Sequence, residues 1–378
     1  MSRGDRWLLV LPLALTAVGL IMVYSSSAIL GLTRFQDPNY YFTRQVFRTV
    51  LGLAVLLIAA KADLRRLERF APVILGVAAA LLALVVVAGH MSNGATRWLR
   101  LGFLTLQPTD LGRLAMVVFL ASWLKRHPPA ELGFLRGLLP PLGILGVLCG
   151  LIMLQPNLSS AALLGLAGFL MLFLSGAPLR HLAVPVGAGV AAVLVALQTH
   201  PYMMGRVNTF VRFVVSGDLD ARGSGWQLDQ SLIAIGSGGL IGKGLGGGLQ
   251  KYLFLPEAHT DFIFSILAEE LGFVGATGLL TLIGLLVWRG LRVAARTQEP
   301  FAALLAAGLT LQIGLYALVN LGVATGIAPT TGLPLPFVSY GGSALLANMA
   351  AAGLLYRISA MNQTEAALAA QRWSREMA

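Results

Sequence analysis

Long runs of hydrophobic residues, broken by short polar stretches, cover most of this chain of 378 residues. Many runs reach the roughly 20 residues that a helix needs to cross a bilayer. The strands of a membrane β-barrel alternate apolar and polar residues, so unbroken runs favour helices. Ten segments are predicted, over residues 7–29, 44–61, 71–90, 108–125, 137–154, 158–176, 180–198, 261–288, 300–325 and 341–360. We therefore predict an all-α polytopic membrane protein, with one transmembrane domain over residues 1–360 and a polar cytoplasmic tail over residues 361–378.

The composition agrees with this class. Hydrophobic residues make up 57% of the chain and charged residues 11%, far below the roughly 25% charged content of a soluble domain. The net charge is +11, which in a soluble protein would suggest a nucleic-acid partner. In a polytopic membrane protein the basic residues first set the orientation, so we expect no nucleic-acid partner.

The basic residues alternate between the two sides of the predicted helices. One side holds 16 of them: Arg3, Arg6, Lys61, Arg65, Arg66, Arg69, Lys125, Arg126, Arg136, Arg180, Arg289, Arg292, Arg296, Arg357, Arg372 and Arg375. The connections opposite hold fewer, mainly Arg34, Arg44, Arg48, Arg97 and Arg100. The side richer in Lys and Arg is normally cytoplasmic. We therefore expect a protein of the cytoplasmic (inner) membrane with both termini inside and residues 199–260 outside.

Residues 199–260, between the seventh and eighth predicted helices, form a connection far longer than is usual. Within it, Trp226–Gly236 has the pattern of a short amphipathic or re-entrant helix. The stretch Gly236–Gly248 then contains eight glycines. Glycine permits close backbone approach, so this stretch either folds back toward the membrane or lets a ligand lie against main chain. A flexible hinge is the alternative.

Asp261 follows this connection in the motif Leu255–Phe262, where the eighth predicted helix begins. The chain has only 16 Asp and Glu residues, so carboxylates at a membrane boundary require a chemical reason. One reading is a helix cap made by Thr260 or Asp261. The other is a general base whose pKa is set by polar neighbours, among which we expect Glu257, His259 and Lys243.

Other polar clusters are predicted on the same, outer face. They are the stretch Asn93–Trp98 with Arg97, the helix start Gln107–Arg113, the turn Gln155–Asn157, and the charge-free, Pro- and Gly-rich stretch Gly326–Ser343. Asp110 and Arg113 lie three residues apart on one helix face, where they can pair with each other or bind a charged headgroup. The last stretch predicts non-helical backbone that lines the site.

The candidate substrate-binding residues are therefore Arg97, Asp110, Arg113, Lys243, Glu257, His259 and Ser339, with Asp261 as the candidate catalytic residue. Cys and His clusters with zinc spacing are absent from the sequence. The ligands of a metal stay unknown at this stage, although carboxylates suit Mg²⁺ or Mn²⁺.

Three motifs together make the chain resemble the SEDS family of bacterial cell-wall synthases: Leu255–Phe264, Gly332–Ser343 and Ile233–Leu240. The resemblance extends from Tyr24–Ser27 to Arg357. The run Asp37–Gln45 and Ala258 look more like the FtsW, or division, branch than the RodA, or elongation, branch.

The resemblance implies ten membrane helices and a peptidoglycan glycosyltransferase that extends glycan strands from lipid II on the outer face. Asp261 matches the family's essential aspartate and would act as the general base of an inverting transfer. Arg97, Arg113, Lys243 or a divalent cation would stabilise the pyrophosphate. The implied partners are a class B penicillin-binding protein transpeptidase and other divisome or elongasome membrane proteins; no organic cofactor is implied.

The chain departs from the family pattern in two places. Asp110 and Arg113 stand where the family usually has Glu and Lys, which keeps the charges but alters their reach. Asn157 replaces a common aspartate, which puts an ionic role at that position in doubt. Two other functions stay open, a lipid II transporter (flippase) and a non-catalytic scaffold, but polar clusters concentrated on one face favour catalysis over alternating access.

Overall fold

The structure, a computed structural model, describes residues 4–92, 95–101, 104–199, 201–217 and 224–376. Its elements, in chain order, are α1 (Trp7–Phe35), α2 (Tyr40–Ala59), α3 (Leu64–Ala88), β1 (His90–Ser92), β2 (Ala95–Leu101), β3 (Leu104–Leu106), α4 (Pro108–Arg126), α5 (Pro129–Gly133), η1 (Phe134–Leu138), α6 (Leu139–Met153), α7 (Leu158–Leu174), α8 (Leu179–Thr199), α9 (Pro201–Ser216), α10 (Ser224–Ser237), α11 (Ile263–Arg296), α12 (Pro300–Ala324) and α13 (Gly342–Glu376).

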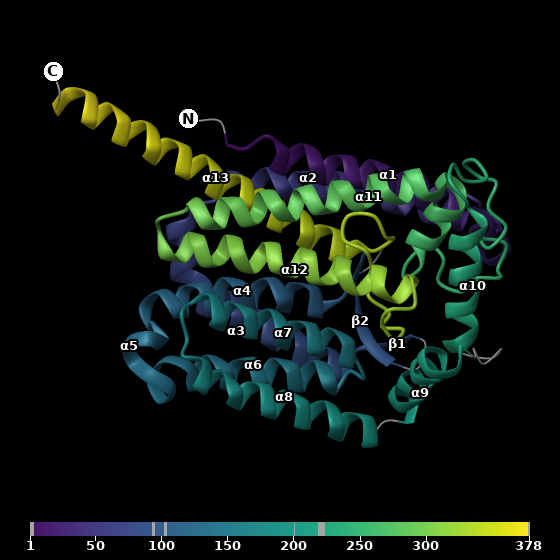
Figure 1. The fold of residues 1–378 in the computed structure, drawn as a ribbon, viewed down its shortest axis with the longest axis horizontal. Coiled ribbons are helices and arrows are strands. Elements are labelled where there is room, and N and C mark those ends of the chain that lie inside the picture. The colour runs from purple at the N-terminus through teal and green to yellow at the C-terminus, as the bar shows by residue number, and fades with distance from the viewer. Residues whose placement is uncertain (1–3, 93–94, 102–103, 200, 218–223, 377–378) are drawn as a thin grey trace.

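The long helices run side by side in one bundle (Figure 1). α1 begins and α13 ends at one end of the bundle, and α10 and the strands lie at the other, which we call the α10 end. Eight helical stretches of the described chain are long and apolar enough to cross a membrane: α1, α2, α3, the stretch from α5 to α6, α8, α11, α12 and α13. The multi-pass helical fold is thus confirmed. α13 continues without a break past residue 360 to Glu376, and the domain boundary placed there stays a prediction.

The other two predicted segments coincide with α7 and α4. α7 is apolar but has only 17 residues. α4 carries Asp110 and Arg113 in its first two turns and Lys125 and Arg126 in its last, which lowers its hydropathy, yet most of its side chains are buried. It packs against α3, α12, α13 and α7, so the buried Asp110 and Arg113 face protein rather than lipid.

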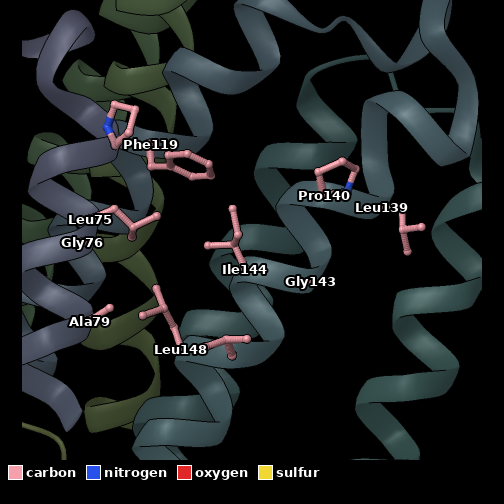
Figure 2. Close-up of a pocket in the computed structure, with 11 residues that line it drawn as sticks. Leu75, Gly76, Ala79, Phe119, Leu139, Pro140, Gly143, Ile144 and Leu148 are labelled. Carbon is pink, nitrogen blue, oxygen red and sulfur yellow. The ribbon is translucent and has the colours of Figure 1, made fainter.

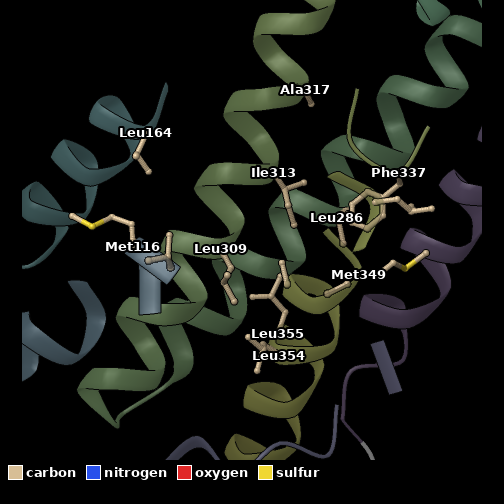
Figure 3. Packing of buried hydrophobic residues seen from close by; sticks show 14 of the residues in the cluster. Met116, Leu164, Leu286, Leu309, Ile313, Ala317, Phe337, Met349, Leu354 and Leu355 are labelled. Carbon is tan, nitrogen blue, oxygen red and sulfur yellow. The ribbon is translucent and has the colours of Figure 1, made fainter. Parts of the chain in front are cut away.

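The core of the bundle lies where α12 and α13 meet α4, α7 and α11. Met116, Leu309, Ile313, Leu354 and Leu355 are buried there from three different helices (Figure 3). Close helix approach in a bilayer depends on small residues at the contact. The interface of α13 with α2 shows this, because a Cβ at Gly353 would lie 2.4 Å from the carbonyl oxygen of Leu56.

A small antiparallel sheet of order β1-β2-β3 connects α3 to α4, a feature that the all-α prediction missed. β1 pairs with β2 through Met91 and Thr96, and β2 pairs with β3 through Arg100 and Thr105. The strands are short, so they give little periodic signal, and the predicted segment 71–90 ran into β1. The connections at 93–94 and 102–103, with the predicted Asn93, lie outside the described residues.

The long connection 199–260 contains two helices. α10 confirms the helix predicted over Trp226–Gly236, whereas α9 was not predicted. The glycine-rich stretch then packs onto α11, where the Lys243 and Gly244 N–H groups donate to the carbonyls of Glu269 and Glu270, both at 3.0 Å. Whether it folds back toward the membrane stays a prediction.

Those carbonyls are available because Gly272 breaks α11 with a φ of +65°. At φ > 0 glycine is favoured, and a Cβ at Gly272 would also lie 2.3 Å from the nitrogen of Gly242. Two ion pairs add to this attachment, Lys243 with Glu269 at 2.9 Å and Lys251 with Glu270 at 2.7 Å. Both glutamates thus hold the glycine-rich stretch against α11.

Candidate active site

Asp261 lies in a turn that precedes α11. The helix begins at Ile263, and its N-cap residue is Phe262, without a side-chain cap hydrogen bond. The carbonyl of Glu257 instead accepts the N–H groups of Thr260 and Asp261, both at 3.1 Å. The helix-cap reading of Asp261 is therefore wrong, and its carboxyl is left for another role.

Two neighbouring segments fix the turn. Asn320 of α12 donates from Nδ2 to the main-chain oxygen of Asp261 at 2.8 Å and to that of Leu333 at 2.7 Å. The Ser339 hydroxyl donates to the Thr260 oxygen at 2.5 Å and accepts the Leu335 N–H at 2.8 Å. Ser339 was predicted to bind substrate; its observed contacts are to main chain, and its binding role stays a prediction.

The surroundings of Asp261 favour a carboxyl that titrates near neutral pH. Burial raises its pKa to about 7, and the Glu257 carboxylate acts in the same direction, whereas Arg206 and Arg97 lower it. A general base works best when its pKa lies close to the operating pH. The site thus has the charge balance that proton abstraction requires.

His259 is buried between two aromatic rings. Its ring centroid lies 4.8 Å from that of Tyr41 and 5.4 Å from that of Tyr340. Burial lowers the pKa of His259 to about 4. The positive charge of Arg34 also lowers this pKa, whereas the Glu257 carboxylate raises it. His259 is therefore neutral at pH 7, and its main-chain oxygen accepts the Tyr340 N–H at 2.9 Å, which ties the turn to the start of α13.

A pocket of about 90 Å³ lies among β2, α9, the start of α7 and the stretch before α13, and it is lined by both polar and apolar residues. It is lined by Arg97, Arg206, Asn157, Ser159, Thr330 and Thr331, together with Pro156, Leu158, Leu197, Met203, Val207 and Pro329. Arg97 donates to the carbonyls of Gln155, at 3.2 Å, and Pro156. Arg206 donates to the Thr330 carbonyl at 2.8 Å. Both guanidinium groups also lower the pKa of the Asp261 carboxyl. The charges of the pocket therefore influence the protonation of Asp261.

Asn157 is the N-cap of α7, where its Oδ1 accepts the Ser160 N–H at 3.3 Å. The predicted turn between two helices is confirmed. An amide caps a helix as well as a carboxylate does, so the replacement of the family's aspartate keeps this structural contact but removes a negative charge from the pocket.

Asp110 and Arg113 pair with each other, as their spacing predicted. The Arg113 Nε lies 3.5 Å from an Asp110 oxygen, and both side chains are buried. Arg113 also donates to Asn348 at 3.1 Å and lies over the Tyr316 ring. The pair joins α4 to α12 and α13, and its proposed contact with a substrate stays a prediction.

Lys243 and Glu257 occupy different places. Lys243 reaches the buried Glu269, as described above, so its charge is already paired. Glu257 is exposed, and its carboxylate accepts the Thr260 hydroxyl at 2.9 Å. Of the seven predicted binding residues, Arg97, Glu257, His259 and Ser339 therefore contact or act on the Asp261 turn.

Sequence reasoning missed Asn320 and Arg206. Asn320 could have been noticed as an amide within the apolar run 300–325, because buried polar groups in membrane helices are usually functional or paired. Arg206 carried no such signal, since α9 was not predicted.

The described residues contain no group of three His, Cys, Asp or Glu side chains that could hold a metal ion. Glu257 is the acidic side chain that acts on the Asp261 carboxyl. Mg²⁺ is often held by one or two carboxylates together with substrate phosphates. The exposed Glu257 carboxylate thus suits a cation that is also held by substrate phosphates.

A larger groove of about 490 Å³ lies among α3, α4 and α6. Figure 2 shows that Leu75, Phe119, Ile144 and Leu148 line it. All its lining residues are apolar or glycine or proline, so the groove lacks groups for catalysis.

Comparison with known proteins agrees with this arrangement. The cell cycle protein family FtsW/RodA/SpoVE matches residues 6–364. The probable peptidoglycan glycosyltransferase FtsW of Thioalkalivibrio sulfidiphilus is 42% identical over 362 residues, covering 94% of this chain and 90% of the relative.

Two solved structures are also similar. A chain from a peptidoglycan synthase complex that coordinates polymerization and crosslinking matches with a TM-score of 0.77 and 33% identity, over 95% of this chain and 98% of that one. The rod shape determining protein RodA of Thermus thermophilus matches with a TM-score of 0.69 and 32% identity, over 94% and 96% of the two chains.

Proposed function

The chain belongs to the FtsW/RodA/SpoVE family of cell cycle proteins, and from this premise we propose that it is a peptidoglycan glycosyltransferase that polymerises lipid II during cell division. The observation that carries the proposal is the Asp261 carboxyl, whose pKa is raised to about 7 and which Arg97 and Arg206 influence from the adjoining pocket. A base beside cations is what a sugar transfer with an anionic leaving group requires.

In the proposed reaction Asp261 accepts the proton of the C4 hydroxyl of the acceptor GlcNAc. The oxygen attacks C1 of the donor MurNAc on the face opposite its diphosphate, the new glycosidic bond forms, and the bond from C1 to the diphosphate oxygen breaks. The electron pair leaves with undecaprenyl diphosphate. Attack from the opposite face inverts the configuration at C1, so one carboxylate suffices as base.

Arg97 and Arg206 are the groups proposed to stabilise the departing diphosphate. Guanidinium groups bind phosphate oxygens in a fixed geometry and stay charged when partly buried. Their main-chain contacts to Pro156 and Thr330 hold them in place before substrate arrives. Such preorganised charges are effective because they need no rearrangement as negative charge develops.

A divalent cation, Mg²⁺ or Mn²⁺, is proposed as the cofactor. Its ligands would be diphosphate oxygens with Glu257, which leaves Asp261 free as the base, and when bound it would supply additional positive charge to the leaving group.

The site is proposed to open to the outer face of the cytoplasmic membrane. The distribution of Lys and Arg supports this orientation, as does the position of α10 at the end opposite the start of α1. Lipid II with its sugars on that face would reach Asp261 from the α10 end.

Elongation of the cell wall is the second candidate role, because RodA is among the similar structures. The chemistry is the same, so localising a tagged copy at midcell or along the side wall separates the two. The proposed partner in either case is a class B penicillin-binding protein, supported by the likeness to a chain of a peptidoglycan synthase complex.

The transporter is less well supported. Lys125 pairs with Glu68 at 2.9 Å and Glu299 at 2.7 Å, and Arg289 pairs with Asp5 at 3.1 Å. These contacts tie helices together at the end away from α10. An alternating-access motion that separates these helices would break such pairs, at a cost for each partly buried pair.

The test is incubation of the purified protein with lipid II, Mg²⁺ or Mn²⁺ and its transpeptidase partner, followed by separation of the glycan products by size. The proposal predicts long glycan chains. Movement of labelled lipid II across a liposome membrane without any polymer would instead establish the transporter.

A further inference from the structure

Arg48, which neither the family resemblance nor the proposed mechanism uses, lies in an unusual position. It is 7% exposed, and its Nη1 is buried without a hydrogen-bond partner among the described residues. Its guanidinium carbon lies 4.5 Å from the centre of the Tyr340 ring. A Cβ added to Gly342 would lie 3.0 Å from its Nε, so the side chain rests against the first residue of α13.

This position is electrostatically unfavourable for a cation on its own. The first N–H groups of a helix have no acceptor within the helix, and the macrodipole places positive charge there. A buried cation beside that end adds like charge to like charge. Within the described part of the chain, the ion pairs do not include Arg48. An anion between the guanidinium and the helix would reverse the balance.

Neighbouring hydrogen bonds fix the position of Arg48 relative to the first turn of α13. Gln45, one turn before Arg48 on α2, accepts the Gly341 N–H and donates to the Ser339 carbonyl, at 3.4 and 3.5 Å. On the other side of α13, the Ser343 hydroxyl accepts the Gln107 N–H at 3.0 Å. α2 and α4 thus fix the first turn of α13 from two sides, so the arrangement is built before any ligand arrives.

The position relative to Asp261 indicates which ligand fits. The Tyr340 ring contacts both Arg48 and His259, and His259 is two residues from Asp261. Arg97 and Arg206 are the cations that act directly on the Asp261 carboxyl. Arg48 is not among the charged groups that change the pKa of that carboxyl, which indicates a position farther from the base than those of Arg97 and Arg206.

The two lipid substrates of the proposed reaction also differ in how far their diphosphate lies from the base. The donor diphosphate is attached to the carbon under attack, so it must lie close to the base. The acceptor diphosphate is separated from the reacting C4 hydroxyl by the two rings of its disaccharide. Both substrates carry the same anionic group at different distances from Asp261.

We propose that Arg48 and the first turn of α13 bind the diphosphate of the acceptor lipid, while the pocket of Arg97 and Arg206 binds that of the donor. This inference rests on the proposed function. It assigns two lipid diphosphate sites to one chain, one beside the Asp261 carboxyl and one at Arg48. Arg48 is a binding residue for the acceptor and takes no part in proton transfer.

The test counts binding sites for a soluble short-chain lipid II analogue on the full-length Asp261→Asn protein in nanodiscs, where turnover is blocked. Two classes of site are expected. Adding Arg48→Gln should lower the affinity of one class of site for the analogue by about tenfold or more, the loss expected when a charge-assisted hydrogen bond is removed. The matched control is Arg44→Gln, one turn earlier on α2 and exposed over the Tyr40 ring, which should leave both classes unchanged.

Arg48→Lys keeps the charge and should retain the second class with reduced affinity. If Arg48→Gln lowers only the unfolding temperature and leaves two classes of unchanged affinity, Arg48 is structural and the inference is overturned. If phosphatidylglycerol in the nanodisc displaces the analogue from the class that depends on Arg48, the site belongs to a phospholipid headgroup, and the inference is likewise overturned.

Polymerisation by the parent protein is measured separately. A parent that polymerises lipid II while Arg48→Gln keeps both classes contradicts only the acceptor site. A parent that makes no polymer but binds two analogues, one through Arg48, contradicts the proposed function while the second site stands.

Discussion

Asn320 of α12 donates a hydrogen bond of 2.8 Å to the main-chain oxygen of Asp261. The same nitrogen donates at 2.7 Å to Leu333, in the stretch before α13. One buried amide therefore sets the position of the catalytic candidate relative to two separate walls of the site.

Replacing Asn320 by Leu should lower polymerisation by roughly tenfold or more, because small displacements of a catalytic group are costly. It should also cost about 1–3 kcal/mol of unfolding free energy, the range for a lost buried hydrogen bond. Initial rates and thermal unfolding of the purified variant measure the two effects.

Gln312→Leu is the matched control. Gln312 is also a buried amide of α12, and it donates to the Arg113 carbonyl at 2.7 Å, away from Asp261. It should lose similar stability but keep most of its activity. Equal losses of activity in both variants would show that stability alone explains the effect of Asn320.

The polymerisation rate should increase with pH and level off above about 7, the value to which burial raises the pKa of Asp261. Glu257→Gln removes a negative charge that helps to raise this pKa, so the profile of that variant should shift toward lower pH. Rates measured across the neutral range check both points. Glu131→Gln, a change of an exposed glutamate on α5, should leave the profile in place; a Glu257 variant with an unshifted profile contradicts this account.

Asp261 should also make stability depend on pH. Its folded pKa of about 7 lies above its ordinary value of 3.8, so between these values the folded state binds more protons than the unfolded state. The free energy of unfolding contributed by this group is present below the lower value and is lost as pH rises through the higher one.

Asp261→Asn removes the titrating group and should unfold at a higher temperature than the parent at about pH 8, with a smaller difference at about pH 5. Thermal unfolding at both pH values checks the sign. A difference that grows on acidification would mean that the folded state lowers the pKa of Asp261.

Gly272→Ala should destabilise the protein by at least about 1 kcal/mol, since its φ of +65° and its contact with Gly242 exclude a side chain. The loss should release the glycine-rich stretch, which hydrogen exchange at Lys243 and Gly244 would detect. Gly284→Ala, on the same helix in open space, should be neutral or slightly stabilising. A harmless Gly272→Ala would show that the break in α11 is not required.

The long helices were predictable because crossing a lipid bilayer demands long apolar runs. Even α4, which carries four charges and is not among the eight candidate spans, kept enough apolar residues to be found. The sheet was not, because β1 and β3 have three residues each, too few for a periodic signal. The attachment of the glycine-rich stretch was only partly predictable. Its glycines indicated close approach, but the break at Gly272 that receives it depends on a contact distant in the sequence.

The candidate site was likewise predictable only in part. The spacing of Asp110 and Arg113 correctly predicted an ion pair, because residues three apart meet on a helix. The Asp261 motif indicated chemistry, but the capping alternative could only be rejected once the helix start at Ile263 was known. Arg206 enters the site through tertiary packing of α9, which no local pattern reveals.

The most direct test of the central claim is the rate of lipid II polymerisation by Asp261→Asn, measured beside the parent on protein shown to be equally folded. Loss of a general base predicts a rate lower by about 10² to 10⁴, with the lipid II analogue still bound. A folded Asp261→Asn protein that polymerises lipid II at the parental rate would contradict the assignment of Asp261 as the base.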